Sequence, residues 1–111
     1  MRQYVLDEIG KEDMERAVRW LEERAERSSV EGLYWVNFPP DMLAPVQFKH
    51  KECQPHCFAV EVGDDVVKFE LLVRSRSSHR CRACQVYASP QQRQFILDMA
   101  DRLIMEAHVR T

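Results

Sequence analysis

The stretch FAVEVGDDVVKFELLVRS (residues 58–75) constrains the fold more than any other part of this chain. Apolar residues occupy every second position on both sides of the sequence GDD, at 58, 60 and 62 and again at 67, 69, 71 and 73. Alternation with a period of two indicates strands that bury one face, and Gly and Asp are common turn residues. We therefore predict an antiparallel β-hairpin here.

Helical patterns lie at both ends of the chain. Residues 11–27 have apolar side chains at the i, i+3, i+4 and i+7 spacing of an amphipathic helix. Residues 90–109 have a wider apolar face, preceded by Ser89 as an N-cap residue, with Pro90 at the first helical position. Between the two patterns we expect short strands at 33–38, 46–50 and 84–89, and residues 1–9 fit either a strand or a helical lead-in.

This order of elements predicts one α+β domain over residues 1–111. Strands grouped between two helices favour an antiparallel sheet of about four strands, with the N-terminal and C-terminal helices on one face. One small sheet does not cover the whole apolar face of the second helix. Either the first helix packs beside it, or part of the face forms a homodimer interface through the C-terminal helix.

Cysteines and histidines gather at the two ends of the predicted hairpin, in HKECQPHC (residues 50–57) and HRCRAC (residues 79–84). Because a hairpin brings its ends together, we expect these clusters to meet around one zinc ion. The predicted ligands are Cys53, Cys57, Cys81 and Cys84. The alternative ligands are His50, His56 and His79.

In spacing alone, residues 53–84 resemble a zinc ribbon, in which two turns that carry thiolates hold one ion beside β-structure. The Cys81-x2-Cys84 spacing is usual for such a turn, whereas Cys53-x3-Cys57 is one residue longer. Since His50-x2-Cys53 and Cys53-x2-His56 can also chelate, three cysteines and one histidine form a second candidate set. Four protein ligands leave no open coordination position, so we expect the ion to be structural.

Two other interpretations of the cysteines remain open. All four could be reduced thiols packed as small apolar residues. Alternatively, Cys81-x2-Cys84 could carry thiol redox chemistry, because arginines on both sides of Cys81 favour a thiolate. A thioredoxin-like motif is expected at the start of a helix, whereas this one precedes a predicted strand.

Charge is unevenly distributed along a chain whose formal net charge is −2. Residues 1–32 carry nine acidic and six basic side chains, whereas residues 71–85 carry four arginines and no acid. These arginines are Arg74, Arg76, Arg80 and Arg82. The stretch suits a polyanion and makes a nucleic-acid-associated module our second functional hypothesis. A solvated strand-and-turn surface is the favoured explanation of these arginines.

The first 20 residues have no apolar signal-peptide core, and no window holds the roughly 18 apolar residues of a membrane span. We therefore expect a cytoplasmic protein without a membrane span, a setting in which cysteines are metal ligands or reduced thiols rather than disulfides. The leading hypothesis is a non-catalytic zinc domain with a binding or regulatory role and an unknown protein partner. The third hypothesis is a thiol-redox or metal-dependent enzyme.

Overall fold

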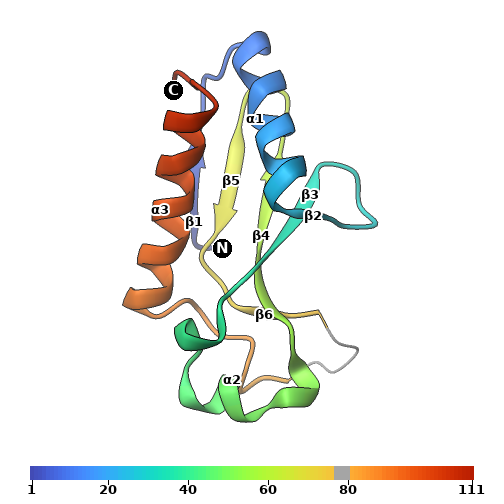
Figure 1. Ribbon diagram of the computed structural model, residues 1–111, viewed down its shortest axis with the longest axis vertical. Coiled ribbons are helices and arrows are strands. Elements are labelled where there is room, and N and C mark those ends of the chain that lie inside the picture. Colours follow the sequence, from blue (N-terminus) through green and yellow to red (C-terminus); the bar gives the residue numbers. More distant parts are fainter. Residues whose placement is uncertain (77–80) are drawn as a thin grey trace.

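The computed structural model describes residues 1–76 and 81–111, which fold into a sheet covered by helices (Figure 1). The helices are α1 (Lys11–Arg24), α2 (Pro45–Lys49) and α3 (Pro90–Glu106), and the 3-10 helices η1 (Pro40–Met42) and η2 (Lys51–Cys53) flank α2. The strands are β1 (Gln3–Leu6), β2 (Glu26–Arg27), β3 (Leu33–Asn37), β4 (His56–Val62), β5 (Val67–Glu70) and β6 (Arg74–Ser75).

The sheet is antiparallel, in the order β1-β5-β4-β3-β2, and β6 pairs with the first residues of β4. The predicted hairpin is confirmed, since Val60 of β4 lies opposite Phe69 of β5 and the Gly63 N–H donates to the Val66 carbonyl at 2.8 Å. Within residues 1–76 and 81–111, six strands take part rather than about four. The difference arises because residues 3–6 form an edge strand and because β2 and β6, of two residues each, join the sheet.

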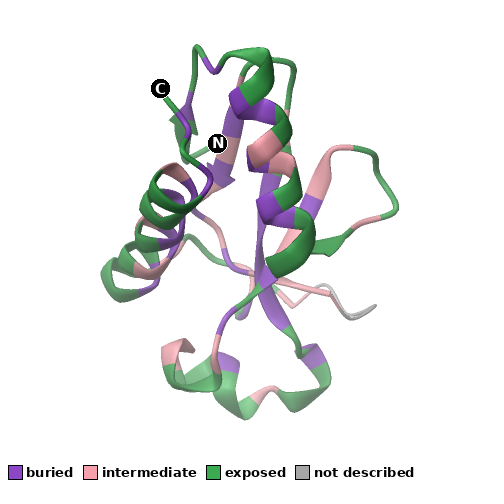
Figure 2. Ribbon diagram, turned by 45° about the horizontal axis from the view of Figure 1, so that its top comes forward, coloured by how far each residue is buried: buried purple, intermediate pink, exposed green. Residues whose placement is uncertain are grey.

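The hydrophobic core lies on one face of the sheet. Phe58, Val60 and Phe69 point to this face and are fully buried, in the same cluster as Leu21 of α1 and Leu103 of α3. Because the cluster is continuous, α1 and α3 cover the same face of the sheet (Figure 2). The predicted α+β arrangement of an antiparallel sheet with both terminal helices on one face is confirmed.

The strand predicted at residues 46–50 is wrong, because this segment belongs to α2. Pro45 occupies the first helical position, where its fixed φ suits a helix and its missing N–H has no intrahelical partner to lose. The Gln47 side chain accepts a hydrogen bond from the Ala44 N–H at 2.9 Å. These local contacts outweigh a short apolar–polar alternation, which by itself is weak evidence for a strand.

The strand predicted at residues 84–89 is also wrong, since within it Tyr87 makes only an isolated bridge to Leu72. The N-terminal helix ends earlier than predicted, and the residues that follow it form β2. The C-terminal helix begins as predicted. Ser89 Oγ accepts the Gln92 N–H at 3.2 Å, and Gln92 Oε1 accepts the Ser89 N–H at 3.0 Å, which is a reciprocal cap.

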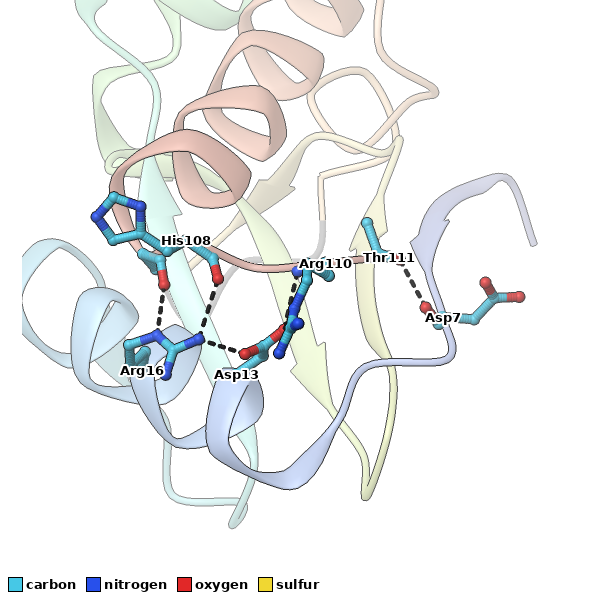
Figure 3. Close-up of polar contacts among 7 residues, drawn as sticks. Asp7, Asp13, Arg16, His108, Arg110 and Thr111 are labelled. Atoms are coloured by element: carbon cyan, nitrogen blue, oxygen red, sulfur yellow. Dashed lines mark hydrogen bonds and ion pairs between the residues drawn. The ribbon is translucent and has the colours of Figure 1, made fainter.

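The buried carboxylate of Asp13, in the first turn of α1, accepts hydrogen bonds from the residues that follow α3 (Figure 3). Asp13 is 2 % exposed and accepts hydrogen bonds from the Arg110 backbone N–H at 3.0 Å and from the Arg16 guanidinium. Arg16 also donates to the carbonyls of Ala107 at 2.9 Å and His108 at 3.0 Å. Hydrogen bonds from Arg110 lower the pKa of Asp13 below its usual value, and the bond from the Arg110 backbone N–H has the largest effect.

Candidate metal centre

The segment between α2 and β4 and the segment that leads into α3 come together at one end of the molecule (Figure 1). His50 follows α2, Cys53 ends η2, and Cys81 and Cys84 lie in the turn region before α3. One ligand atom from each of these four residues lies within 4.8 Å of the others. The protein therefore has a group of one histidine and three cysteines, called here the Cys/His group, that could hold a metal ion.

The two halves of the Cys/His group have the same backbone geometry. The Cys53 N–H donates to the His50 carbonyl at 3.0 Å, and the Cys84 N–H donates to the Cys81 carbonyl at 3.2 Å. Each half is thus a single turn with two residues between its ligands. The x2 spacing in the sequence is compatible with His50 as the partner of Cys53, but Cys53-x2-His56 has the same spacing, so the structure was needed to distinguish them.

The separations within the group fit tetrahedral zinc. His50 Nδ1 lies 3.4 Å from Cys81 Sγ and 3.4 Å from Cys84 Sγ. Zinc–sulfur bonds of about 2.3 Å and zinc–nitrogen bonds of about 2.0–2.1 Å, at tetrahedral angles, place neighbouring nitrogen and sulfur ligands about 3.5 Å apart. The imidazole nitrogen therefore lies at the distance of a neighbouring zinc ligand from each of the two sulfur atoms.

The three thiols of the group differ in acidity. A hydrogen bond with His50 lowers the pKa of Cys81 to about 7, whereas burial raises the pKa of Cys84 to about 12. Burial also raises the pKa of Cys53. Adjacent thiolates repel one another, and a divalent cation between them would offset that repulsion. This is the electrostatic situation of a cysteine-rich metal site.

Hydrogen bonds from neighbouring side chains hold both turns in place. Gln47 of α2 is fully buried, and its Nε2 donates to the Cys84 carbonyl at 2.9 Å. Its Oε1 accepts a hydrogen bond of 2.9 Å from Gln92 Nε2, which joins the turn to the start of α3. On the other side, Ser75 Oγ of β6 donates to the Cys53 carbonyl. Such outer hydrogen bonds fix the orientation of metal ligands.

Cys57 and His56 lie outside the Cys/His group among the described residues. Cys57 is fully buried in β4, its Sγ donates to the Arg74 carbonyl at 3.6 Å, and burial raises its pKa to about 12. Cys57 pairs with Arg74 of β6 in the sheet, apart from the turn that contains Cys53. His56 is 2 % exposed, and its ring nitrogens have no hydrogen-bond partner in the described part of the chain. The four-cysteine set stays a prediction.

Two of the four arginines proposed for a polyanion are engaged in ion pairs. Arg74 Nε lies 2.5 Å from Glu70 Oε1, and Arg76 donates two bonds of 2.6 and 2.7 Å to Glu26. Arg82 is exposed, and Arg80 lies outside the described residues, as does His79. A nucleic acid would have to compete with these carboxylates for Arg74 and Arg76, and nucleic-acid binding stays a prediction.

Comparison of the chain with known protein families, with curated proteins and with solved structures found no match. Across residues 1–76 and 81–111, none of the helices is long and apolar enough to cross a membrane. The functional argument therefore rests on the Cys/His group and its surroundings.

Proposed function

We propose that this protein is a small zinc-binding α+β domain in which the ion has a structural role, and that the domain acts as a binding or regulatory module. The observation that carries the proposal is the position of His50 Nδ1, which lies 3.4 Å from the sulfur atoms of both Cys81 and Cys84. Cys53 would supply the fourth ligand. Three thiolates and one imidazole are a usual ligand set for structural zinc.

A structural role follows from the number of ligands and from their place in the fold. Four protein ligands fill a tetrahedral ion, which leaves no position for water or substrate. The ion would join the segment around α2 to the turn before α3, two segments that pack against the core cluster through Met42, Leu43 and Ala88. The core cluster contains none of the four cysteines. Zinc would therefore stabilise this end of the molecule rather than the whole fold.

A binding role is supported by exposed apolar side chains on the segments that zinc would hold. Val46 and Phe48 of α2 are 39 % and 51 % exposed, and Val86, two residues after Cys84, is 43 % exposed. Large apolar side chains on a surface favour contact with another protein. A domain that uses zinc to fix such residues would present them in a defined arrangement.

The direct test is the metal content of protein purified under reducing conditions without chelators. We expect one zinc ion per chain by atomic emission, and a Co²⁺-substituted sample with the visible absorption bands of tetrahedral thiolate coordination. A content below about 0.2 zinc ions per chain would reject the proposal, since structural sites bind zinc tightly.

Matched cysteine variants test the ligand set. Cys53→Ser should lose zinc, whereas Cys57→Ser should keep it, because Cys57 lies outside the Cys/His group. His50→Ala should change the Co²⁺ spectrum. Loss of zinc in Cys57→Ser with an unchanged His50→Ala spectrum would instead support the four-cysteine set.

A further inference from the structure

The four cysteines differ in their access to solvent. Cys53 is 2 % exposed, and Cys57 and Cys84 are fully buried. Cys81 is partly exposed, and it lies at the start of its turn. Cys81 is therefore the cysteine most open to a small solute, whereas the other three are buried.

Cys81 and Cys84 also have the geometry that a disulfide needs. The hydrogen bond from the Cys84 N–H to the Cys81 carbonyl, at 3.2 Å, closes a turn between them. Such a turn holds its first and fourth Cα atoms within about 7 Å, and disulfides form at Cα separations of about 4.4–6.8 Å. Both sulfur atoms lie 3.4 Å from the same atom, His50 Nδ1, so they occupy one side of the turn.

We propose that Cys81 is a site of oxidation by hydroperoxides, with Cys84 as the resolving thiol, and that formation of the Cys81–Cys84 disulfide releases the metal ion. This inference rests on the proposed zinc site and adds a second property to it. The exposed sulfur meets the oxidant, and its buried neighbour completes the reaction.

The chemistry balances in two steps. The Cys81 thiolate attacks one oxygen of the hydroperoxide, the O–O bond breaks, and the second oxygen leaves and takes up a proton, which gives a sulfenic acid on Cys81. The Cys84 thiolate then attacks the Cys81 sulfur, the S–S bond forms, and hydroxide leaves and is protonated to water. The two sulfur atoms together lose two electrons, and the peroxide gains them.

Oxidation would remove two of the four ligands of the ion. His50 and Cys53 alone form a single chelating turn, which is insufficient for the tight binding of a four-ligand zinc site. The helices and the β4–β5 hairpin would stay folded, because the core cluster contains no cysteine. The predicted change is thus confined to the segments around α2 and before α3, which also carry Phe48 and Val86.

The experiment treats the zinc-loaded, reduced protein with a small excess of hydrogen peroxide. A chromogenic zinc indicator follows release of the ion, and mass spectrometry of peptides, after alkylation of free thiols, maps the disulfide. We expect one zinc ion to be released per chain, a disulfide between Cys81 and Cys84, and recovery of zinc binding after dithiothreitol and added zinc. Cys57→Ser is the matched control and should release zinc at the same rate.

Three outcomes would overturn the inference. Zinc could stay bound under peroxide, the disulfide could join Cys53 to another cysteine, or zinc could leave with Cys81 unmodified. Each of these leaves the zinc site itself in place, because the starting protein is shown to carry zinc. Absence of zinc from the reduced protein would overturn the inference together with the proposed function, so the two failures are distinguishable.

Discussion

Replacement of Gln47 by alanine is expected to destabilise the zinc-loaded protein by about 2–4 kcal/mol and to weaken zinc binding about 10-fold. Gln47 is fully buried and is not a ligand. From its place in α2, its side chain makes three hydrogen bonds. They join it to the Ala44 N–H before α2, to the Cys84 carbonyl and to Gln92 at the start of α3. The variant therefore tests whether the surroundings of the Cys/His group hold it in place.

The magnitude follows from the groups that lose a partner. The Ala44 N–H is partly buried and loses its bond to Gln47 Oε1, and one buried N–H of Gln92 Nε2 loses its bond to the same oxygen. The Cys84 carbonyl loses the bond from Gln47 Nε2 but keeps the bond from the Val86 N–H at 3.2 Å. Gln92 keeps its bond to the Met42 carbonyl at 3.0 Å. A buried polar group left without a partner costs about 1–3 kcal/mol, and two such groups, one of them partly solvated, give the expected range.

Urea unfolding followed by tryptophan fluorescence measures the free energy of unfolding, and competition with a zinc chelator measures the affinity. The matched control is Gln94→Ala. That side chain bonds to Asp98 at 2.8 Å on the exposed surface of α3, so its loss should cost less than about 0.5 kcal/mol. If Gln47→Ala were as stable as this control and bound zinc with unchanged affinity, the reasoning would be refuted.

Three further predictions concern the rest of the molecule. Phe58→Ala should lower the free energy of unfolding by about 3–5 kcal/mol, because the ring is fully buried and its centroid lies 5.3 Å from that of the Phe38 ring. A loss below about 1 kcal/mol in urea unfolding would contradict this. Asp13→Asn should lower the melting temperature at pH 7, and the difference from the unmodified protein should narrow as the pH falls. Because the pKa of Asp13 is lower in the folded state, its carboxylate stabilises the fold above the unfolded-state pKa of about 4, and this stabilisation is lost as the pH falls through the folded-state pKa. A difference in melting temperature that stays constant from pH 7 to pH 3 would contradict this. If the chain dimerises through α3, Met105→Glu should yield monomers in sedimentation equilibrium, since this side chain is 73 % exposed; an unmodified protein that is monomeric at all concentrations excludes the dimer.

Much of the fold could be predicted from sequence because its signals are local. The alternation of apolar and polar residues on both sides of Gly63 predicted the β4–β5 hairpin, and Ser89 as N-cap predicted the start of α3. Both signals come from residues that are neighbours along the chain. The meeting of the two cysteine clusters followed from the same hairpin. Where the signal was short the prediction failed, as at residues 46–50, because five residues of alternation cannot be distinguished from one helical turn.

The choice between His50 and Cys57 could not be made with certainty from spacing. Both residues lie close to Cys53 in sequence, and both can chelate an ion together with it. In the structure, β4 begins at His56 and carries Cys57 into the sheet, whereas η2 turns His50 and Cys53 toward the same point. The position at which a strand begins depends on its partners in the sheet.

The sequence by itself thus determined the α+β class, the central hairpin, the two long helices and the presence of a candidate metal site built from both cysteine clusters. Only the tertiary structure decided which atoms meet: the pairing of Arg76 with Glu26, 50 residues apart, the burial of Gln47 against Cys84, and the inclusion of His50 in the Cys/His group. The physical reason is the range of the interactions. Periodicity, turns and caps involve residues close along the chain, whereas ligand geometry and charge pairing depend on segments that only the folded sheet and helices bring together.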